Sequence, residues 1–391
     1  VSAGQTGGQG GSAYATRSRF VVSNYGMGGS LQSGMAESRW GGPAAALLKW
    51  ETTNQFDIGL DIAFLNNRVN LTVDAYYKKT KDLLLDKLIP MSSGFSRIQA
   101  NYGNVTNKGL EISGHFIPVK ARNFLWSIDA NISFNRNKVG GLDADQYSDV
   151  AWGIENMFLV RNGEPIGTLY GYVEDGFYDN EAEVRADPLY RNETDSKVKS
   201  MVGEVKYKNL DDDPVIDNRD RQIIGNTNPD YQYGITNTLE WKNWTFSFFL
   251  QGTQGNDVLN VNLKKFDMAS VDNMPYFIYN NRWTAENRAN AKWPRANRTS
   301  TRSMRASDRY IEDGSYLRCK NVSLSYRFRH PMKFVESINL VASVSNLFTI
   351  SGYSWMDPDV NSFGSDPKRR GVDMASYPSA RTFNFGVQIG F

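Results

Sequence analysis

Cysteine and histidine are almost absent from this sequence, which has one of the first and two of the second. A single cysteine, Cys319, excludes an internal disulfide and a cysteine-based metal cluster. His115 and His330 are too few and too isolated for a site built on histidine. Neither sign of charge predominates, since 44 Lys and Arg residues stand against 42 Asp and Glu residues. This balance indicates no nucleic-acid partner.

Long apolar runs are also missing. No stretch approaches the roughly 18 consecutive apolar residues of a membrane-spanning helix. This excludes a transmembrane helix but leaves a transmembrane β-barrel open, because barrel strands carry an apolar residue only at every second position. A signal peptide is absent and the chain begins at Val1 rather than at a methionine. We therefore expect a fragment of a longer protein.

The sequence does contain strict alternation, most clearly in residues 381–391. Large apolar residues alternate there with small or polar ones, namely Phe383, Phe385, Val387, Ile389 and Phe391 with Asn384, Gly386, Gln388 and Gly390. A period of two predicts a β-strand with one apolar face, which the edge of a soluble sandwich would also show. The length of about ten residues, the Gly-rich polar face and the final aromatic favour a membrane barrel. A terminal Phe after alternating aromatics resembles the signal by which outer-membrane barrels are recognised for insertion.

The same alternation recurs along the chain and predicts about ten strands. They lie within residues 1–5, 56–64, 69–77, 108–118, 124–134, 231–241, 244–250, 322–328, 338–344 and 383–391. Short turns are expected at Asn66-Asn67, 120–123, Lys242-Asn243 and His330-Pro331. Long connections are expected over 7–43, 85–106, 139–228, 257–307 and 350–378. The third of these is a large insertion, which we expect to fold on itself.

The regular alternation of short and long connections favours an outer-membrane barrel. Outer-membrane barrels have tight turns at the periplasmic rim and long loops outside, whereas a soluble sandwich or propeller has no reason to segregate loop length in this way. Trp241 and Trp244 bracket one short turn, where an interfacial aromatic girdle would place them. Carboxylates on the polar face would line a wet lumen, because burying them unpaired is costly; they are Asp57, Asp61, Asp74, Glu111 and Asp129. The sequence predicts an all-β fold, a transmembrane antiparallel β-barrel with long extracellular loops.

Several blocks resemble the C-terminal barrel portion of SusC/RagA-type TonB-dependent outer-membrane transporters. They run in the family's order through nearly the whole chain: LKWETTNQFDIGLD (48–61), NYGNVTNKGLEI (101–112), IDANISFNRNKV (128–139), IIGNTNPDYQYGITN (223–237), FFLQGTQGNDVLN (248–260), YIEDGSYLRCKNVSLSY (310–326), NLF (346–348) and PSARTFNFGVQIGF (378–391). The resemblance implies that residues 1–391 are the last ten or so strands of a plugged barrel of about 22 strands. The plug domain and the N-terminal strands would be absent, and residues 139–228 would form a large extracellular insertion.

The resemblance also implies a function. Such proteins import oligosaccharides or peptides across the outer membrane of Bacteroidota-type cells, energised by TonB through the missing N-terminal part, with a SusD-like surface lipoprotein as a lid over the barrel and membrane lipid around it. A passive porin or a surface adhesin remains the alternative. An outer-membrane hydrolase would need a His/Asp or Ser/His pair at the outer rim, where neither histidine is placed, so we expect no enzyme.

One segment, residues 209–220, has the spacing of a calcium loop. Oxygen-bearing side chains fall at positions 1, 3, 5, 9 and 12, with a main-chain carbonyl at position 7, as in an EF-hand; the residues are Asn209, Asp211, Asp213, Asp217, Asp220 and Val215. Related transporters carry a similar acidic stretch before the IIGN block. Pro214 replaces the turn glycine and Asp220 the bidentate glutamate. A structural Ca²⁺ site and a solvated acidic loop both remain open, with no other cofactor expected.

Aromatic residues are frequent in the long connections, at Trp152, Tyr170, Tyr172, Phe177, Tyr178, Trp283, Trp293, Tyr353 and Trp355. Their rings could stack on sugars, contact a lid or pack the connections together. We expect packing for most of them.

Overall fold

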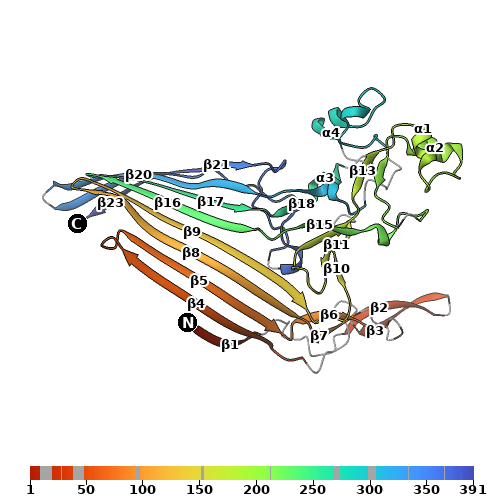
Figure 1. Ribbon diagram of the computed structural model, residues 1–391, viewed down its shortest axis with the longest axis horizontal. Coiled ribbons are helices and arrows are strands. Elements are labelled where there is room, and N and C mark those ends of the chain that lie inside the picture. Colours follow the sequence, from red (N-terminus) through yellow and green to blue (C-terminus); the bar gives the residue numbers. More distant parts are fainter. Residues whose placement is uncertain are drawn as a thin grey trace.

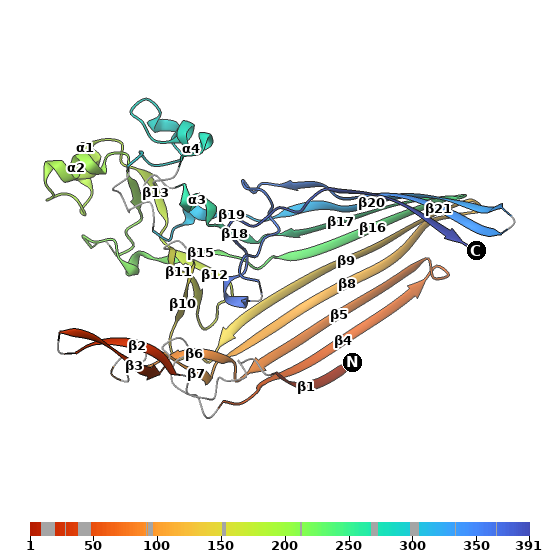
Figure 2. The same ribbon diagram turned by 180° about the vertical axis from the view of Figure 1, so that it is seen from behind.

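The computed structural model describes residues 1–8, 20–27, 29–37, 48–90, 92, 97–150, 154–211, 213–266, 273–297, 305–332, 334–364 and 366–391. Its main element is one curved sheet of ten strands, each hydrogen-bonded to the next (Figures 1 and 2). In sheet order these are β1 (Ser2–Gly8), β4 (Glu51–Phe64), β5 (Val69–Lys81), β8 (Asn104–Ala121), β9 (Phe124–Gly140), β16 (Tyr231–Trp241), β17 (Trp244–Gln254), β20 (Tyr316–Met332), β21 (Val335–Ser351) and β23 (Thr382–Gly390). The predicted antiparallel sheet is confirmed.

The sheet order follows the chain order, and every neighbouring pair is antiparallel. Tight turns join strands at one end of the sheet, and long connections join them at the other, as the loop lengths predicted. At the first tight turn Asn66 and Asn67 have φ angles of 54° and 60°, a left-handed conformation that asparagine tolerates better than most residues. None of the described helices is long and apolar enough to cross a membrane.

The turn predicted at His330-Pro331 is in the wrong place. β20 continues to Met332 and pairs there with Val335, after an irregularity between Arg329 and Met332. His330 has a φ of 48°, so it lies in this irregularity rather than in the turn. A proline donates no hydrogen bond to a strand ladder, but an irregular pair near a strand end tolerates it.

The two faces of the sheet differ as the alternation predicted. Apolar residues lie opposite apolar residues across neighbouring strands, for example Ile112 opposite Ile132, which in turn faces Tyr233. Many apolar side chains of this face remain exposed, for example Phe56 at 48% and Phe385 at 85%. At the end with the tight turns, the rings of Trp244 and Tyr326 lie 4.6 Å apart across paired strands. An exposed apolar face with aromatics at one end matches the lipid-facing surface of a membrane barrel.

The long connections carry structure of their own, gathered beyond one end of the sheet (Figure 1). They hold β10 (Gln146–Val150), β11 (Ile154–Val160), β12 (Thr168–Gly171), β13 (Glu174–Phe177), β14 (Val205–Tyr207), β15 (Gln222–Asn226), β18 (Asp257–Asn260), β19 (Ile311–Asp313), β22 (Val372–Asp373), α1 (Glu181–Ala186), α2 (Asp195–Met201), α3 (Asn262–Lys265), α4 (Tyr276–Asn281), and the 3₁₀ turns η2 (Asn218–Asp220), η3 (Arg288–Asn290), η5 (Asp308–Tyr310) and η6 (Pro367–Arg369). We call the described parts of 141–230, 255–315 and 352–381 the loop lobe.

Two further hairpins lie within segments predicted as irregular loops. They are β2 (Phe20–Met27) with β3 (Ser30–Glu37), and β6 (Leu84–Leu88) with β7 (Arg97–Asn101). A hairpin satisfies the backbone hydrogen bonds of a long connection without a hydrophobic core. The Gly/Ser-rich composition of the first segment therefore does not prevent strand pairing.

The largest hydrophobic core cluster lies in the loop lobe and draws on three long connections. Phe158 and Leu169 of the insertion pack in one cluster with Leu259, Tyr310 and Val372. A second cluster, around Tyr178 and Val198, stays within the insertion. The prediction that the insertion folds on itself is confirmed, because β10, β11, β12 and β15 also pair with one another in one four-stranded sheet. Its inner strands share a core with the later connections, which fixes the lobe as one body.

The helices of the insertion follow ordinary local rules. The Asn180 side chain accepts a hydrogen bond from the Glu183 N–H and starts α1, and Thr194 does the same for α2. Such caps satisfy N–H groups that a helix leaves unpaired at its start. Val184 and Val198 point into the core between the two helices, so short helices with weak intrinsic stability are held by packing.

Candidate functional site

Two open hollows lie on the polar face of the described sheet, which we call the inner wall. The larger, of about 560 Å³, lies over β4, β5, β8 and β9 and is lined by Gln55, Asp57, Asp74, Tyr76, Lys78, Asn107, Glu111 and Asn135. Three of the five carboxylates predicted to face a lumen line this hollow. Carboxylates, amides and a lysine in one wall can exchange hydrogen bonds with water or with a polar solute.

The smaller hollow, of about 290 Å³, holds the first histidine. Its lining is Asn70, Thr72, Ser113, Gly114, His115, Asp129, Ala130, Asn131 and Thr236. His115 Nδ1 lies 2.7 Å from Asp129 Oδ1, and the two residues are opposite each other on β8 and β9. The pair lies in the middle of the strands, away from the loop lobe.

Tyr76 crosses the inner wall over a glycine. A Cβ atom built on Gly109 would lie 2.2 Å from the Tyr76 ring, so only glycine lets the ring lie flat on β8. The Tyr76 hydroxyl then donates to Asn135 Oδ1 at 3.1 Å on the next strand. This glycine is required by a close approach and not by its φ angle.

Most of the loop aromatics pack the lobe. Tyr170, Tyr172, Tyr178, Trp283 and Tyr353 are at most 9% exposed, which confirms the packing expectation for these five. Trp152 lies outside the described residues. Buried rings cannot stack on a sugar, so any ligand contact of the lobe has to come from other side chains.

Arginines join these rings. The Arg221 guanidinium lies 4.8 Å from the Tyr170 ring centre and 5.6 Å from that of Tyr172. The Arg305 guanidinium also contacts Tyr172, at 5.2 Å from the ring centre. Burial lowers the pKa of Arg221, and its Nη2 donates to the carbonyls of Asn156 and Tyr170 at 2.7 and 3.0 Å. No carboxylate of the described residues pairs with Arg221, so the rings and carbonyls stabilise this buried cation.

Two buried ion pairs, one within the lobe and one between the lobe and β20, had no signal in the sequence pattern. Arg309 Nη2 lies 2.5 Å from Glu174 Oε2, and their side chains are 5% and 16% exposed. Arg318 of β20 contacts Asp357 of the last long connection. Each pair joins segments more than 35 residues apart, which only the folded chain brings together.

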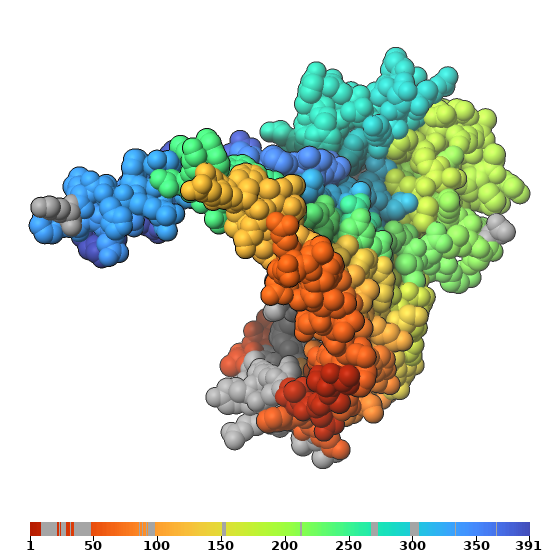
Figure 3. Space-filling model, turned by 60° about the vertical axis from the view of Figure 1, so that its left-hand side comes forward, coloured from red at the N-terminus to blue at the C-terminus, as the bar shows by residue number. Residues whose placement is uncertain are grey.

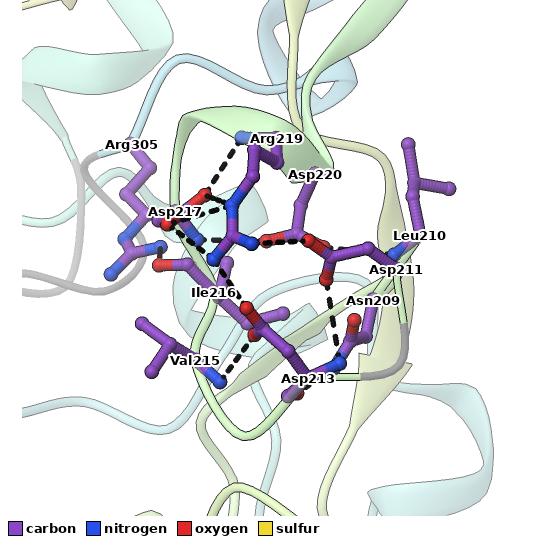
Figure 4. A network of polar contacts seen from close by, with 10 residues as sticks. All are labelled: Asn209, Leu210, Asp211, Asp213, Val215, Ile216, Asp217, Arg219, Asp220 and Arg305. Carbon is purple, nitrogen blue, oxygen red and sulfur yellow. Dashed lines mark hydrogen bonds and ion pairs between the residues drawn. The ribbon is translucent and has the colours of Figure 1, made fainter.

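The acidic loop, residues 209–220, gathers three of its carboxylates around an arginine (Figure 4). Arg219 Nη1 lies 3.1 Å from Asp211 Oδ2, and Nη2 contacts Asp213 and lies 3.0 Å from Asp217 Oδ2. Hydrogen bonds from the Arg219 side chain and backbone hold the pKa of Asp217 below its usual value. Among the described residues, no group of three or more His, Cys, Asp and Glu side chains is arranged to hold a metal ion.

The other predicted ligands of the loop are used differently. Asp220 turns toward the backbone, where its two oxygens accept the N–H groups of Leu210 and Asp217 at 2.8 and 2.7 Å. The Val215 N–H donates to Asp213 Oδ1 at 2.8 Å. Asn209 Nδ2 donates to the Asp213 carbonyl at 2.6 Å, whereas Asn209 Oδ1 is buried without a hydrogen-bond partner. Carboxylate and amide oxygens are the ligands that a hard cation prefers.

Comparison with known proteins identifies the family of this chain. The family model of TonB dependent receptor-like β-barrels matches residues 2–347. The chain belongs to this family. Its relatives include TonB-dependent receptor P26 of Formosa agariphila, 33% identical over 100% of this chain and 39% of the relative. TonB-dependent receptor SusC of Bacteroides thetaiotaomicron is 29% identical over 88% of this chain and 32% of the relative. This TonB-dependent receptor barrel therefore spans less than half the length of these relatives.

Solved structures give the same fold. The structure of the RagAB peptide transporter superposes on the whole chain with a TM-score of 0.76 at 19% identity, covering 40% of that chain. The RagAB peptide importer in the "closed-closed" state gives a TM-score of 0.73 at 20% identity. The SusC/RagA-type resemblance, the partial barrel of a larger protein and the outer-membrane location are confirmed.

Proposed function

We propose that this chain is the C-terminal part of the barrel of a TonB-dependent importer that carries oligosaccharides or peptides across the outer membrane. The single observation that carries the proposal is the two-faced ten-stranded sheet, with an apolar outer face and a polar, hollowed inner face. A polar inner wall lets a hydrophilic solute exchange its hydration for wall hydrogen bonds during passage. Relatives named as TonB-dependent receptors support the proposal that TonB supplies the energy for import.

The proposal includes a SusD-like surface lipoprotein that closes over the loop lobe. Support comes from the similarity to SusC and from solved RagAB structures whose titles name a peptide importer with "open-open" and "closed-closed" states. A lobe with a shared core can present a stable surface to such a lid. TonB would act through the part of the protein outside this chain.

Uptake assays test the importer against its alternatives. The full-length gene is expressed with and without the neighbouring lipoprotein gene, in cells with and without a functional TonB system. Candidate oligosaccharides and peptides are supplied as the only carbon source. We expect growth to require both components. Growth that survives both losses would identify a passive porin, and surface binding with no uptake in any strain would identify an adhesin.

No enzymatic step is part of the proposal. The His115–Asp129 pair lies on the inner wall, in the middle of its strands. An outer-membrane hydrolase needs such a pair at the outer rim. Family relatives are receptors and transporters rather than hydrolases. Incubating the purified full-length protein with the imported ligand should therefore leave that ligand chemically unchanged.

We also propose that the acidic loop binds one structural Ca²⁺. The proposed donors are the side-chain oxygens of Asn209, Asp211, Asp213 and Asp217, because Asn209 Oδ1 has no hydrogen-bond partner among the described residues and the three carboxylates converge on Arg219. A calcium ion would supply charge neutralisation that holds the loop together. A crystal structure of the full-length protein with calcium should show six or seven oxygens at about 2.3–2.6 Å from one density peak. Carboxylates still bound to Arg219, with no peak between them, would contradict the site.

A further inference from the structure

The larger hollow of the inner wall, which we call the Tyr76 hollow, is built on four strands in register. Its central row crosses β4, β5, β8 and β9 and consists of Asp57, Tyr76, Gly109 and Asn135, each opposite the next. The rows on either side contribute Gln55, Lys78 and Asn107, and Asp74 and Glu111. In the space-filling view these strands are the orange part of an arc that runs from the blue strands to the red strand (Figure 3).

Two glycines make room for the hollow. Gly109 lets the Tyr76 ring lie on β8, and Gly59 lets the Asp74 side chain lie on β4, because a Cβ atom at either glycine would collide with that side chain. Tyr76 and Asp74 both belong to β5, so the two side chains lean in opposite directions from one strand. The hollow has a volume of about 560 Å³, within the range of about 300–1,000 Å³ that is usual for small-molecule sites.

We propose that the Tyr76 hollow is a subsite for a neutral sugar ring, which stacks on Tyr76 while its hydroxyl groups bond to the surrounding carboxylates and amides. This inference rests on the proposed importer function and selects uncharged oligosaccharides from the two ligand classes named there. The subsite lies on the inner wall, which an imported solute has to pass.

The Tyr76 ring is held in place as a platform. One side lies against Gly109, and the hydroxyl donates to Asn135 Oδ1 at 3.1 Å. Asn135 Nδ2 in turn lies 3.5 Å from Asn107 Oδ1 in the neighbouring row. The ring therefore lines the hollow in a fixed orientation, and its open side offers apolar surface to the C–H groups on one face of a sugar. A platform that is already fixed loses little conformational freedom when a ligand binds.

The polar groups around the ring suit a ligand with many hydroxyl groups. Asp74 and Glu111 lie opposite each other on β5 and β8. Neither carboxylate forms a hydrogen bond or an ion pair with the described residues, and the Lys78 ammonium forms none either. The carboxylates can only accept hydrogen bonds, whereas the ammonium can only donate them. A sugar hydroxyl both donates and accepts, so one ring can satisfy groups of both kinds.

The same groups disfavour charged solutes. Three carboxylates and one ammonium line the hollow, those of Asp57, Asp74, Glu111 and Lys78, so an acidic sugar is repelled. A lysine or arginine side chain of a peptide is attracted by the carboxylates. It has no acceptor, however, for the donors of Lys78 and of the amides. A neutral sugar is the ligand that leaves none of these groups without a partner.

Calorimetric titration of the full-length protein in detergent tests the subsite. The neutral probes are hexasaccharides of glucose, mannose, xylose and galactose, and the charged probes are hexagalacturonic acid and tri-lysine. We expect at least one neutral probe to bind, and each charged probe to bind about tenfold more weakly or less. Tyr76→Ala removes the platform and should weaken binding of the best neutral probe about tenfold. Tyr76→Phe keeps the ring and should stay within about twofold of wild type.

Two further variants control the result. Tyr77→Ala removes the same type of side chain from the next residue of β5, which lies opposite Phe56 on the apolar face, so binding should be unchanged. Gly109→Ala keeps the tyrosine but displaces its ring, and should weaken binding as Tyr76→Ala does. Unchanged heat-dependent mobility on a denaturing gel shows that each barrel is folded, and Gly109→Ala carries the comparison if Tyr76→Ala does not fold.

Four results would overturn the inference. Absence of binding by every neutral probe would mean that the hollow takes no sugar of this class. Equal affinity of wild type and Tyr76→Ala would mean that the ring is not the platform, and an equal loss in Tyr77→Ala would mean that the effect is not local. Tighter binding of tri-lysine than of every neutral probe would assign the hollow to cationic peptides. These measurements do not use uptake, so TonB-dependent growth decides the importer proposal separately.

Discussion

Arg318 and Asp357 form a buried ion pair in which the two side chains are 1% and 6% exposed. Arg318 projects from β20, and Asp357 lies in the long connection between β21 and β23. The arginine also donates to Thr349 Oγ1 and Ser379 Oγ, both at 3.0 Å. The last long connection is therefore fastened to the barrel wall by one fully paired cation.

Replacing Asp357 by Ala should lower the free energy of unfolding by about 3–5 kcal/mol, because the buried Arg318 then loses its buried carboxylate partner and keeps only the half-exposed Asp359. The measurement is denaturant unfolding of the full-length protein in detergent. Asp359→Ala is the matched control. Its carboxylate lies 3.6 Å from Arg318 and is 48% exposed, so its loss should cost about 0–1 kcal/mol. Equal effects of the two substitutions would argue against a dominant role for Asp357.

The same pair predicts a pH dependence. Burial alone would raise the pKa of Asp357, but hydrogen bonds from the Ser379 and Asp359 N–H groups and from Arg318 hold it below its usual value. A depressed pKa contributes stability above the unfolded value of about 3.9, and this contribution is lost as the pH falls through the folded value. Wild type should therefore lose more thermal stability than Asp357→Asn between about pH 5 and pH 2.5. Parallel profiles would contradict the shift.

Arginine substitutions test the assignment of the two sheet faces. Ile128 lies on the apolar face opposite Phe116, whereas Asn131 lies on the inner wall opposite Ser113. In the full-length protein Ile128→Arg should cost about 2–4 kcal/mol of unfolding free energy if it faces lipid at mid-membrane. Asn131→Arg should be mild, because the inner wall is polar. Folding in lipid vesicles measures both, and equal tolerance would contradict the assigned faces.

Gly109 and Tyr76 provide a test of packing on the inner wall. Gly109→Ala should force the Tyr76 ring away and break its hydrogen bond to Asn135, at a cost of about 0.5–1.5 kcal/mol. In a Tyr76→Ala background the same substitution should be neutral or slightly stabilising, because glycine is unfavourable in a strand by about 0.5–1 kcal/mol. The unfolding free energies of the four proteins form a double-mutant cycle. A purely additive cycle would show that the ring does not need the glycine.

Local sequence patterns were sufficient to predict the ten-stranded sheet. The alternation around Phe56, Ile128 and Phe385 depends only on the period of a strand, so faces, strand number and the order of short and long connections followed from residue types. The turn expected at His330-Pro331 failed because a register irregularity absorbed the proline, and irregularities leave no periodic signal. The acidic loop was found by spacing, but the role of Arg219 was not, because spacing does not say which charges will meet.

The sequence by itself determined what depends on neighbours along the chain: a two-faced antiparallel barrel sheet, its tight turns and an acidic loop at residues 209–220. Only the tertiary structure decided what depends on distant residues. It joined the long connections around Phe158 and Leu259 in one core, buried Arg318 against Asp357, and placed the Arg219 guanidinium among three carboxylates. The physical reason is that strand periodicity is a property of successive residues, whereas burial and ion pairing depend on which segments meet in space.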